Sequence, residues 1–286
     1  MRLATFSDSN GTRIGLVVED QIVDLKRARP ELPTDMIAFL AAGPQALEAA
    51  RGAIGTTSAT LNLKDVRLHA PVPKPSKFLA IGLNYADHVK ESGLAKPSSP
   101  LFFNKQVSCV TGPFDPILMP YDSEQVDYEG EMGFIIGKRC RRVSRERAHE
   151  VIAGYCVIND VSIRDWQFRA QTFTLGKSFD GHGPVGPWIV TPDELKDPHQ
   201  LRIRTWVNGE LRQDSSTDQL IYDCFEQVAA LSQAFTLEPG DIVSTGTPAG
   251  VGMGFKPPKY LKVGDVVKIE LEGVGVIENR VAPEPA

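Results

Sequence analysis

The stretch of sequence that decides the fold places three carboxylates in an otherwise apolar run. It reads Val126-Asp127-Tyr128-Glu129-Gly130-Glu131-Met132-Gly133-Phe134-Ile135-Ile136. Side chains alternate along a strand, so Asp127, Glu129 and Glu131 are expected on one face and the apolar side chains on the other. Carboxylates this close raise one another's pKa or need a cation between them, commonly a divalent ion with oxygen ligands. The stretch therefore predicts either a buried strand with a metal site or an edge strand with a solvated acidic face.

A further carboxylate favours the metal site. After a predicted helix over Arg145–Ala153, which Gly154 would end, the apolar run Tyr155–Asn159 leads directly into Asp160. If this run is a strand beside the first one, Asp160 meets Glu129 and Glu131. The order of strand, helix and strand thus predicts a cluster of three carboxylates.

The composition excludes several classes of protein. The chain has 286 residues, of which 42% are hydrophobic and 23% charged, as in an ordinary globular protein. Lys and Arg total 31 against 36 Asp and Glu, so there is no electrostatic footprint for nucleic acid. No run approaches the roughly 18 apolar residues of a membrane span. The N-terminus lacks a signal-peptide core. We therefore expect a cytoplasmic protein without a membrane partner.

The cysteines indicate neither zinc nor a disulfide framework. They are widely spaced and form no C-x-x-C pair. We expect reduced, mostly buried thiols at all four positions: Cys109, Cys140, Cys156 and Cys224.

The chain divides near residue 70. Residues 2–25 alternate short β-rich runs with turns, and Asn10-Gly11 is a hairpin signal. Two short helices follow, one capped by Thr34 and the other over Gln45–Arg51. Ala70–Pro75 reads as an extended connector because it is rich in proline. We predict a small N-terminal α+β domain over residues 1–70 and a main domain over residues 71–286.

The main domain combines short strands with one longer amphipathic helix. Pro100–Lys105 is one of the short runs that read as strands. Thr217 is a candidate cap for the helix, in which apolar residues recur at spacings of three and four. This predicted core stripe consists of Leu220, Cys224, Val228, Leu231 and Phe235.

Three other segments carry candidate functional residues. His88 and Glu91 lie three apart in a predicted short helix and can form a hydrogen bond, although this spacing is more often a plain surface pair. A glycine-rich loop carries Lys177, which is either a solvated cation or a positive group aimed into a site. The loop Thr245–Gly252 is rich in backbone N–H groups, so it either holds a carboxylate or only connects strands.

Taken together, five segments resemble the fumarylacetoacetate hydrolase family, in the branch with a short N-terminal domain. They follow the family order over about residues 75 to 282. The segments are Ile81–His88, Asp127–Glu131, Ile158–Gln167, Gly176–Asp180 and Thr245–Gly252. The resemblance implies an α+β, mostly β fold with a mixed β-roll catalytic domain over residues 71–286, usually assembled as a homodimer.

The resemblance also implies the roles of individual residues. Glu129, Glu131 and Asp160 would bind Mg²⁺, Mn²⁺ or Ca²⁺, in agreement with the carboxylate pattern. His88 and Glu91 would form a general-base dyad on a lid. The residues expected to contact substrate are Arg164, Gln167, Lys177, Gly246, Thr247 and His182. His182 is either a pocket determinant of this protein or a bystander with an ordinary hydrogen bond.

These parts predict a metal-dependent hydrolase that cleaves the C–C bond of acylpyruvates or other 2,4-dioxo acids, of the fumarylpyruvate type. A bound metal would act as a Lewis acid for the enolate leaving group. His88, oriented by Glu91, would deprotonate the attacking water. Lys177 would offset charge on the oxyanion or hold the substrate carboxylate.

Two other readings remain. The same site could decarboxylate oxaloacetate-like acids, or tautomerise or hydrate an unsaturated 2-oxo acid, because a family label does not decide the reaction. A binding protein without turnover is the third reading. The intact carboxylates, Lys177 and the pair of His88 and Glu91 argue against it.

Overall fold

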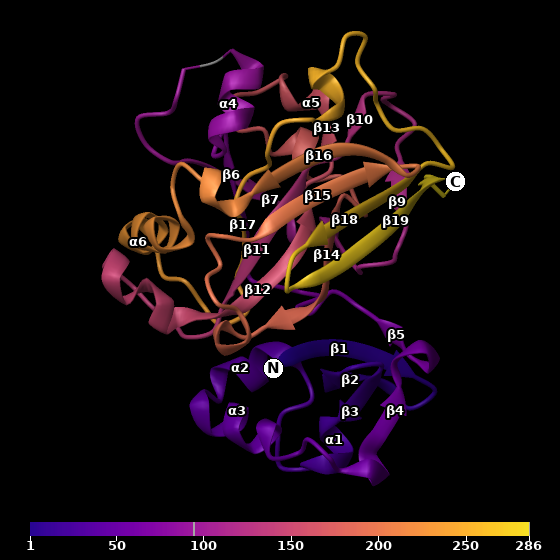
Figure 1. The fold of residues 1–286 in the computed structure, drawn as a ribbon, viewed down its shortest axis with the longest axis vertical. Helices are drawn as coiled ribbons and strands as arrows, with labels where there is room; N and C mark the ends of the chain where they lie inside the picture. Colours follow the sequence, from indigo (N-terminus) through magenta and orange to yellow (C-terminus); the bar gives the residue numbers. More distant parts are fainter. Residues whose placement is uncertain (94, 286) are drawn as a thin grey trace.

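The computed structural model describes residues 1–93 and 95–285, and it consists mostly of β-strands (Figure 1). The N-terminal residues, drawn in indigo, form the lower part of the molecule in Figure 1, and the remaining residues form the larger upper part. The predicted α+β, mostly β fold class is confirmed.

One large sheet runs through both parts of the molecule. Its strands are β1 (Arg2–Asp8), β2 (Gly11–Val18), β3 (Gln21–Asp24), β4 (Thr60–Asn62), β5 (Arg67–Leu68), β6 (Phe78–Gly82), β7 (Leu101–Lys105), β8 (Val110–Thr111), β11 (Gly130–Ile136), β12 (Ile152–Asn159), β14 (Gly183–Val190) and β17 (Ile242–Ser244). The strand order is β4-β3-β2-β1-β14-β12-β11-β17-β6-β7, with β5 on β1 and β8 on β14. Because β11 lies between β12 and β17 and is buried along its whole length, the reading as an edge strand is excluded.

A second sheet packs against the first. Its strands are β9 (Ile117–Met119), β15 (Arg202–Val207), β16 (Glu210–Ser216), β18 (Val266–Leu271) and β19 (Gly275–Pro283), and a separate short pair joins β10 (Val126–Asp127) to β13 (Ser162–Ile163). The order of the second sheet is β16-β15-β18-β19-β9. Phe134 and Val157 of the large sheet share one buried cluster with Ile203, Ile269 and Ile277 of the second. The main core therefore lies between the two sheets.

The small N-terminal part follows the sequence pattern closely. The predicted hairpin at Asn10-Gly11 is confirmed, because β1 and β2 pair antiparallel from Asp8 opposite Gly11. Gly11 has a φ of 94°, a conformation that favours glycine. The helices are α1 (Leu25–Ala28), α2 (Met36–Ala41) and α3 (Pro44–Arg51). The cap of α2 is Asp35 and not Thr34, since the Asp35 carboxylate accepts a hydrogen bond from the backbone N–H of Ala38 at 2.9 Å.

The two parts are joined by backbone pairing as well as by the connector. Strand β1 pairs antiparallel with β14, with Arg2 opposite Val190 and Leu3 opposite Ile189. The large sheet is therefore continuous across the predicted boundary near residue 70, and the division into residues 1–70 and 71–286 stays a prediction.

Two predicted helices of the main part differ in the structure. The first is a 3₁₀ helix over Arg145–Val151, and the chain then enters β12 directly. Gly154 lies inside that strand and does not end a helix. Glycine is required at this position because a Cβ would be 2.2 Å from the carbonyl oxygen of Val190. The second is α6 (Cys224–Ala234), whose N-terminal cap is Asp223 and not Thr217.

The start of α6 has a clear physical cause. Asp223 accepts hydrogen bonds from the backbone N–H groups of Phe225 and Glu226, and Glu226 in turn accepts one from the backbone N–H of Asp223. This capping box satisfies several N–H groups at the helix start. Cys224, Val228 and Leu231 are buried as predicted, whereas Leu220 and Phe235 lie outside the helix.

The remaining helical segments are short. Helices α4 (Ala86–Ser92) and α5 (Arg164–Gln167) lie near each other at the upper end of the molecule in Figure 1. The other 3₁₀ turns are Thr57–Ala59, Leu63–Asp65, Val107–Cys109, Leu175–Lys177, Pro192–Glu194, Thr217–Gln219 and Gly252–Gly254.

Candidate active site

The three predicted carboxylates meet where β11 begins and β12 ends. These strands are antiparallel, with Gly130 opposite Asn159 and Glu131 opposite Ile158. The start of one strand therefore lies beside the end of the other. One oxygen from each of Glu129, Glu131 and Asp160 lies within 4.8 Å of the others, and all three residues are buried. Antiparallel pairing thus gathers the cluster that the sequence pattern indicated.

Asp127 does not join this cluster, although Arg164 contacts both Asp127 and Glu129. The regular strand is interrupted between β10 and β11. The Asp127 carboxylate instead accepts hydrogen bonds from Nε of Arg164 at 2.9 Å and from the backbone N–H groups of Gly252 and Met253 at 2.7 and 2.9 Å. Asp127 therefore anchors one wall of the site.

Two buried cations face Glu129. Nζ of Lys177 lies 2.7 Å from Oε2 of Glu129 and 2.8 Å from Oδ2 of Asp160, and Nη1 of Arg164 lies 2.6 Å from Oε1 of Glu129. Burial acts to raise the pKa of Glu129, but the charges of Lys177 and Arg164 outweigh burial and lower it to about 2. Burial acts to lower the pKa of Lys177, yet Asp160 and Glu129 raise it. Lys177 is only 2% exposed, which excludes the reading as a solvated loop cation.

Glu131 has the opposite electrostatic environment. Burial, together with the charges of Asp160 and Glu129, raises its pKa well above the usual range. Its Oε2 accepts hydrogen bonds from Ser244 at 2.6 Å and from the backbone N–H of Gly246 at 2.7 Å. Among residues 1–93 and 95–285, no cation forms an ion pair with Glu131.

The cluster fits a divalent cation. Three buried carboxylates form the donor set that hard divalent ions such as Mg²⁺, Mn²⁺ and Ca²⁺ prefer. The unmatched charge at Glu131 gives such an ion an electrostatic reason to bind here.

A cavity of about 440 Å³ opens onto this cluster. Its polar wall contains most of the predicted site residues: His88, Glu91, Glu129, Glu131, Arg164, Gln167, Lys177 and Thr247. Its apolar wall consists of Ile81, Leu83, Phe103, Phe168, Phe173, Val251 and Met253. The structure therefore brings residues from distant parts of the chain to one pocket.

His88 and Glu91 face each other on α4. Nδ1 of His88 lies 3.1 Å from Oε2 of Glu91, whose Oε1 accepts a hydrogen bond from the backbone N–H of Gly250 at 2.9 Å. Burial acts to raise the pKa of Glu91, but the hydrogen bonds from His88 and Gly250 lower it. Because both side chains line the cavity, the reading as a plain surface pair is not supported. Their role as a base dyad stays a prediction.

Two other predicted contacts also line the cavity. Oε1 of Gln167 accepts a hydrogen bond from Nη1 of Arg164 at 2.9 Å. The Thr247 hydroxyl donates to the carbonyl oxygen of Gly130 at 3.0 Å and accepts from Nε2 of Gln213 at 2.8 Å. Both side chains are thus held in fixed positions beside the carboxylates.

Two residues predicted to contact substrate, Gly246 and His182, do not line this cavity. The Gly246 amide is used by Glu131. His182 is fully buried, where its Nε2 donates to the carbonyl oxygen of Leu118 at 2.6 Å and its ring stacks on Phe179. Burial lowers the pKa of His182 to about 4. The position of His182 matches the reading as a bystander in the core.

Lys105 is a site residue that the sequence reading missed. Its Nζ donates to Oδ1 of Asp160 at 2.7 Å, to the carbonyl oxygen of Val161 at 3.5 Å and to the carbonyl oxygen of Lys177. A signal was present, because alternation along the predicted strand places Lys105 on the same face as Phe103. A lysine on an apolar strand face indicates a buried ion pair.

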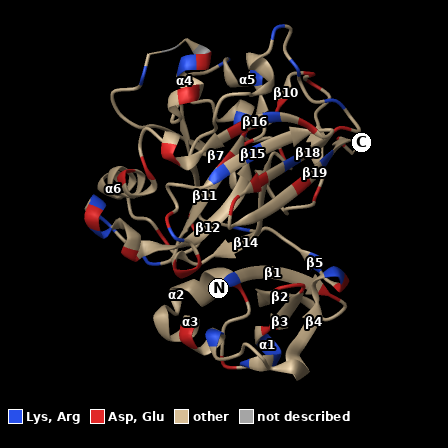
Figure 2. Ribbon diagram, in the orientation of Figure 1, with Lys and Arg blue, Asp and Glu red and all other residues tan. Residues whose placement is uncertain are grey.

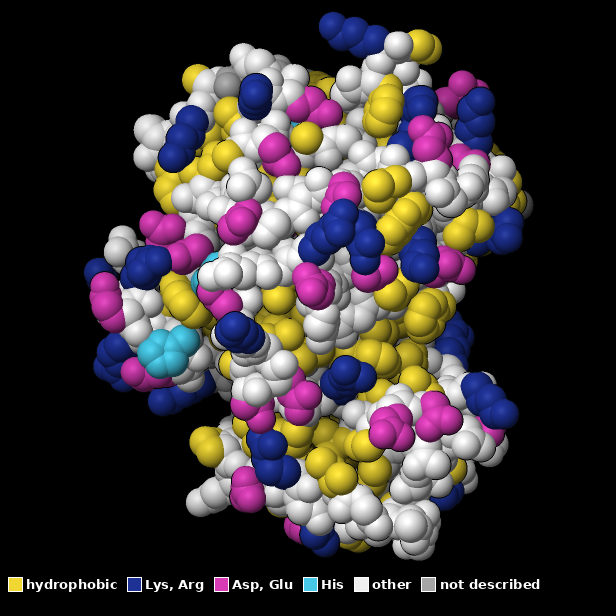
Figure 3. Space-filling model, in the orientation of Figure 1, with side chains coloured by type: hydrophobic (Ala, Val, Ile, Leu, Met, Phe, Trp, Pro, Cys, Tyr) yellow, Lys and Arg dark blue, Asp and Glu magenta, His cyan; other side chains and the backbone are white. Residues whose placement is uncertain are grey.

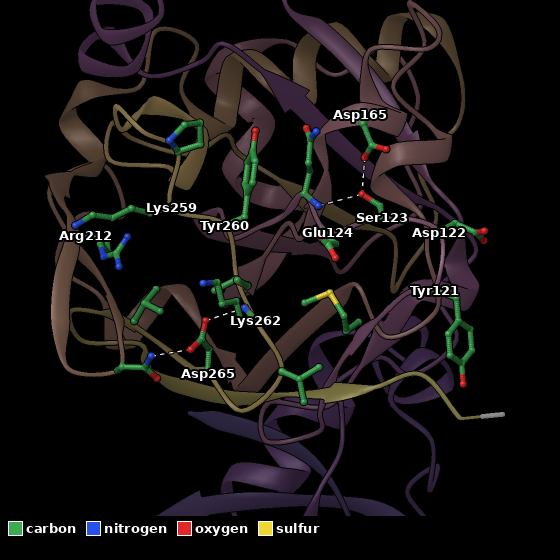
Figure 4. Close-up of a pocket in the computed structure, with 17 residues that line it drawn as sticks. Tyr121, Asp122, Ser123, Glu124, Asp165, Arg212, Lys259, Tyr260, Lys262 and Asp265 are labelled. Atoms are coloured by element: carbon green, nitrogen blue, oxygen red, sulfur yellow. Dashed lines mark hydrogen bonds between the residues drawn. The ribbon is translucent and has the colours of Figure 1, made fainter.

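A second groove, of about 1090 Å³, contains none of the predicted site residues (Figure 4). It mixes charges of both signs, and Ser123 donates a hydrogen bond to Asp165 at 2.6 Å on its wall. Lys and Arg are likewise interspersed with Asp and Glu along the ribbon (Figure 2). The face of the molecule in Figure 3 shows the same mixture of charges. None of the helices in the described part of the chain has the length and apolar composition of a transmembrane segment.

The chain matches the family model "Fumarylacetoacetate (FAA) hydrolase C-terminal" over residues 77–282. It is 44% identical over 287 residues to the mitochondrial oxaloacetate tautomerase fahd2 of Xenopus laevis, covering 98% of this chain and 90% of the relative. It is 38% identical over 300 residues to the oxaloacetate tautomerase YisK of Bacillus subtilis, covering 98% and 100%.

Solved structures agree over the whole chain. The fumarylacetoacetate hydrolase of Exiguobacterium antarcticum superposes with a TM-score of 0.87 at 38% identity, covering 99% of this chain and 100% of the other. The maleylpyruvate hydrolase of Sphingobium sp. SYK-6, in complex with manganese(II) and pyruvate, gives 0.81 at 36% identity, covering 100% of both. These matches confirm the predicted fold type with its small N-terminal sheet. The chain belongs to the fumarylacetoacetate hydrolase family, with a buried acidic cluster suited to a divalent metal.

Proposed function

We propose that this protein is a metal-dependent tautomerase that interconverts the keto and enol forms of oxaloacetate or a closely related 2-oxo acid. The observation that carries the proposal is that a histidine–glutamate pair lines one cavity together with Glu129 and Glu131 of the carboxylate cluster. Relatives named oxaloacetate tautomerases, 38 to 44% identical over nearly the whole chain, support it. The proposal replaces C–C bond hydrolysis as the leading function.

Tautomerisation needs a proton to move between a carbon and an oxygen. In the forward direction, the C3–H bond of the keto acid breaks and its electron pair forms the C2–C3 double bond. The C2 oxygen then takes a proton, so atoms and charge balance without water or a second substrate. A positioned base and a group that offsets negative charge on the C2 oxygen are therefore sufficient.

We assign the metal to Glu129, Glu131 and Asp160. The bound ion would supply Lewis-acid polarisation of the 2-oxo group. Mg²⁺ and Mn²⁺ are the proposed ions, with Ca²⁺ as a further candidate, because all three take carboxylate oxygens. The maleylpyruvate hydrolase structure contains manganese(II).

His88 is the proposed base. Because its Nδ1 faces Glu91 at 3.1 Å, Nε2 is the nitrogen free to take the proton from C3. The Glu91 carboxylate orients the ring and stabilises the imidazolium that forms. The Lys177 ammonium offsets charge on the C2 oxygen, and Arg164, Gln167 and Thr247 bind the remaining polar groups of the acid.

A second candidate function is the hydrolysis of acylpyruvates. The apolar wall of the cavity favours it, because oxaloacetate has no apolar substituent to contact Phe103, Phe168 and Phe173. In that reaction His88 would deprotonate a water, and the C–C bond would break with the enolate of pyruvate as leaving group. Decarboxylation would use the same metal site, and it is measured alongside.

The deciding experiment compares reactions on one purified protein. The protein, with Mn²⁺ or Mg²⁺, is mixed with freshly dissolved enol-oxaloacetate, and the loss of enol absorbance, the release of CO₂ and the cleavage of acylpyruvates are followed separately. The proposal requires enol loss far faster than CO₂ release or acylpyruvate cleavage. If kcat/KM were higher for acylpyruvate cleavage than for enol loss, the second candidate function would be supported instead.

Light scattering on the same sample tests the proposed homodimer.

A further inference from the structure

We infer that Lys105 is a positioning residue, which holds both the metal ligand Asp160 and the backbone of Lys177 in the arrangement that the site requires. The inference rests on the proposed metal site. Lys105 ends β7, it binds the carboxylate oxygen of Asp160 that Lys177 does not bind, and it is 2% exposed. It does not line the cavity, so it acts through the residues that it holds.

The first effect of Lys105 is on the orientation of Asp160. Nζ of Lys105 lies 2.7 Å from Oδ1, whereas Oδ2 faces Nζ of Lys177 at 2.8 Å. Since Lys177 also contacts Glu129, Oδ2 is the oxygen that points toward the cluster. By occupying Oδ1, Lys105 determines which oxygen Asp160 offers to a cation.

The second effect is on Lys177. The carbonyl oxygen of Lys177 accepts a hydrogen bond from Nζ of Lys105. Lys177 belongs to a single 3₁₀ turn, Leu175–Lys177, which by itself gives little rigidity. The third N–H group of Lys105 points to the carbonyl oxygen of Val161 at 3.5 Å. An ammonium has three donors, and here they connect the end of β12 to the turn that carries Lys177.

Three possible roles of Lys105 predict different changes in metal affinity. If Lys105 only balanced charge, removing it would tighten metal binding, because one positive charge near the cation would be lost. If it only stabilised the fold, the melting temperature would fall and metal affinity would not change. If it positions Asp160, metal binding weakens even though the site becomes more negative. The sign of the change therefore separates the three roles.

The experiment compares Lys105→Met with a matched control, Lys77→Met. Lys77 also forms an ion pair with a fully buried aspartate, Asp241, at 2.8 Å, and it does not line the cavity. Mn²⁺ affinity is measured by calorimetry on metal-free, folded protein, together with the melting temperature. For Lys105→Met we expect Mn²⁺ affinity to fall by about 10- to 100-fold, the usual loss for a residue that orients a ligand. The melting temperature of Lys77→Met should be lower than that of the wild type, and its Mn²⁺ affinity should be unchanged.

A second variant covers the case in which Lys105→Met does not fold. Lys105→Arg keeps the positive charge next to Asp160, but its planar guanidinium cannot reproduce the three-way contact. Weaker Mn²⁺ binding and a lower kcat at saturating Mn²⁺ are expected. Wild-type or tighter Mn²⁺ binding in either folded variant overturns the positioning role. If the wild-type protein itself bound no divalent ion, the proposed metal site would fail, which is a different result.

Discussion

Lys177 donates a hydrogen bond of 2.7 Å to Glu129, so the cation of the site and one proposed metal ligand are in direct contact. The Lys177 ammonium thus shares the carboxylates that a metal would bind. Lys177→Met keeps the length of the side chain and removes its charge. We expect kcat to fall by about 10²- to 10³-fold, because a charge that stabilises the oxyanion is lost, and Mn²⁺ affinity to stay the same or increase.

Steady-state kinetics and calorimetry check this prediction. Lys256→Met is the control, since Lys256 lines the same cavity from an exposed position and should be dispensable for kcat. A rise in KM with unchanged kcat in Lys177→Met would instead show that Lys177 binds ground state and transition state equally.

Glu131→Gln should weaken Mn²⁺ binding by more than about 100-fold, since it removes a charged ligand and not merely an outer partner. The melting temperature of the metal-free variant should rise, because the buried charge of Glu131 has no cationic partner among the described residues. Calorimetry and thermal unfolding measure both effects. The control is Glu270→Gln, which affects a partly exposed ion pair with Arg204. Unchanged Mn²⁺ affinity would remove Glu131 from the ligand set.

His88→Ala should reduce the kcat of tautomerisation by about 10²- to 10⁴-fold, the usual effect of removing a positioned base. Glu91→Gln should cost less, because it only misorients the imidazole. The double variant should be little slower than His88→Ala, since the two residues act as one unit. Additive losses would contradict the dyad.

The same His88→Ala protein tests which chemistry depends on the base. Metal-assisted decarboxylation needs no base, so CO₂ release from oxaloacetate should persist at the wild-type rate, and Mn²⁺ affinity should be normal. Equal slowing of enol loss and CO₂ release would assign His88 to substrate binding.

The buried side chain of His182 should make the free energy of unfolding depend on pH in the acidic range. Burial lowers its pKa from 6.5 to about 4, so between these values the unfolded chain binds a proton that the folded protein does not. Stability is therefore lost as pH falls from 6.5 to about 4, by an amount on the order of 3 kcal/mol. Urea unfolding of wild type and His182→Gln over this range measures the difference. The two stability curves should converge at low pH, and parallel curves would contradict the assignment.

The carboxylate cluster was predictable because it depends on local rules. Glu129 directly precedes β11 and Glu131 lies at its start, and antiparallel pairing with β12 brings Asp160 beside them. Asp127 lies outside the cluster, and its carboxylate is bound by Arg164 and a distant loop. No local pattern in the sequence indicates these long-range contacts.

The start of α6 is predictable from the sequence, whereas the burial of His182 is not. The spacing of Asp223 and Glu226 is that of a capping box, and it locates the start of α6. The burial of His182 depends on residues far away in the chain, such as Leu118, so only the tertiary structure separates a pocket residue from a core residue.

The pairing of β1 with β14 has a consequence for the behaviour of a shortened protein. A chain cut near residue 70 would leave the end of β14 around Ile189 and Val190 without the strand that now hydrogen-bonds to it. An uncovered strand of this apolar character offers its free N–H and C=O groups to other molecules and promotes self-association. The first 70 residues thus act as a cover against aggregation for the sheet whose inner strands carry the carboxylates.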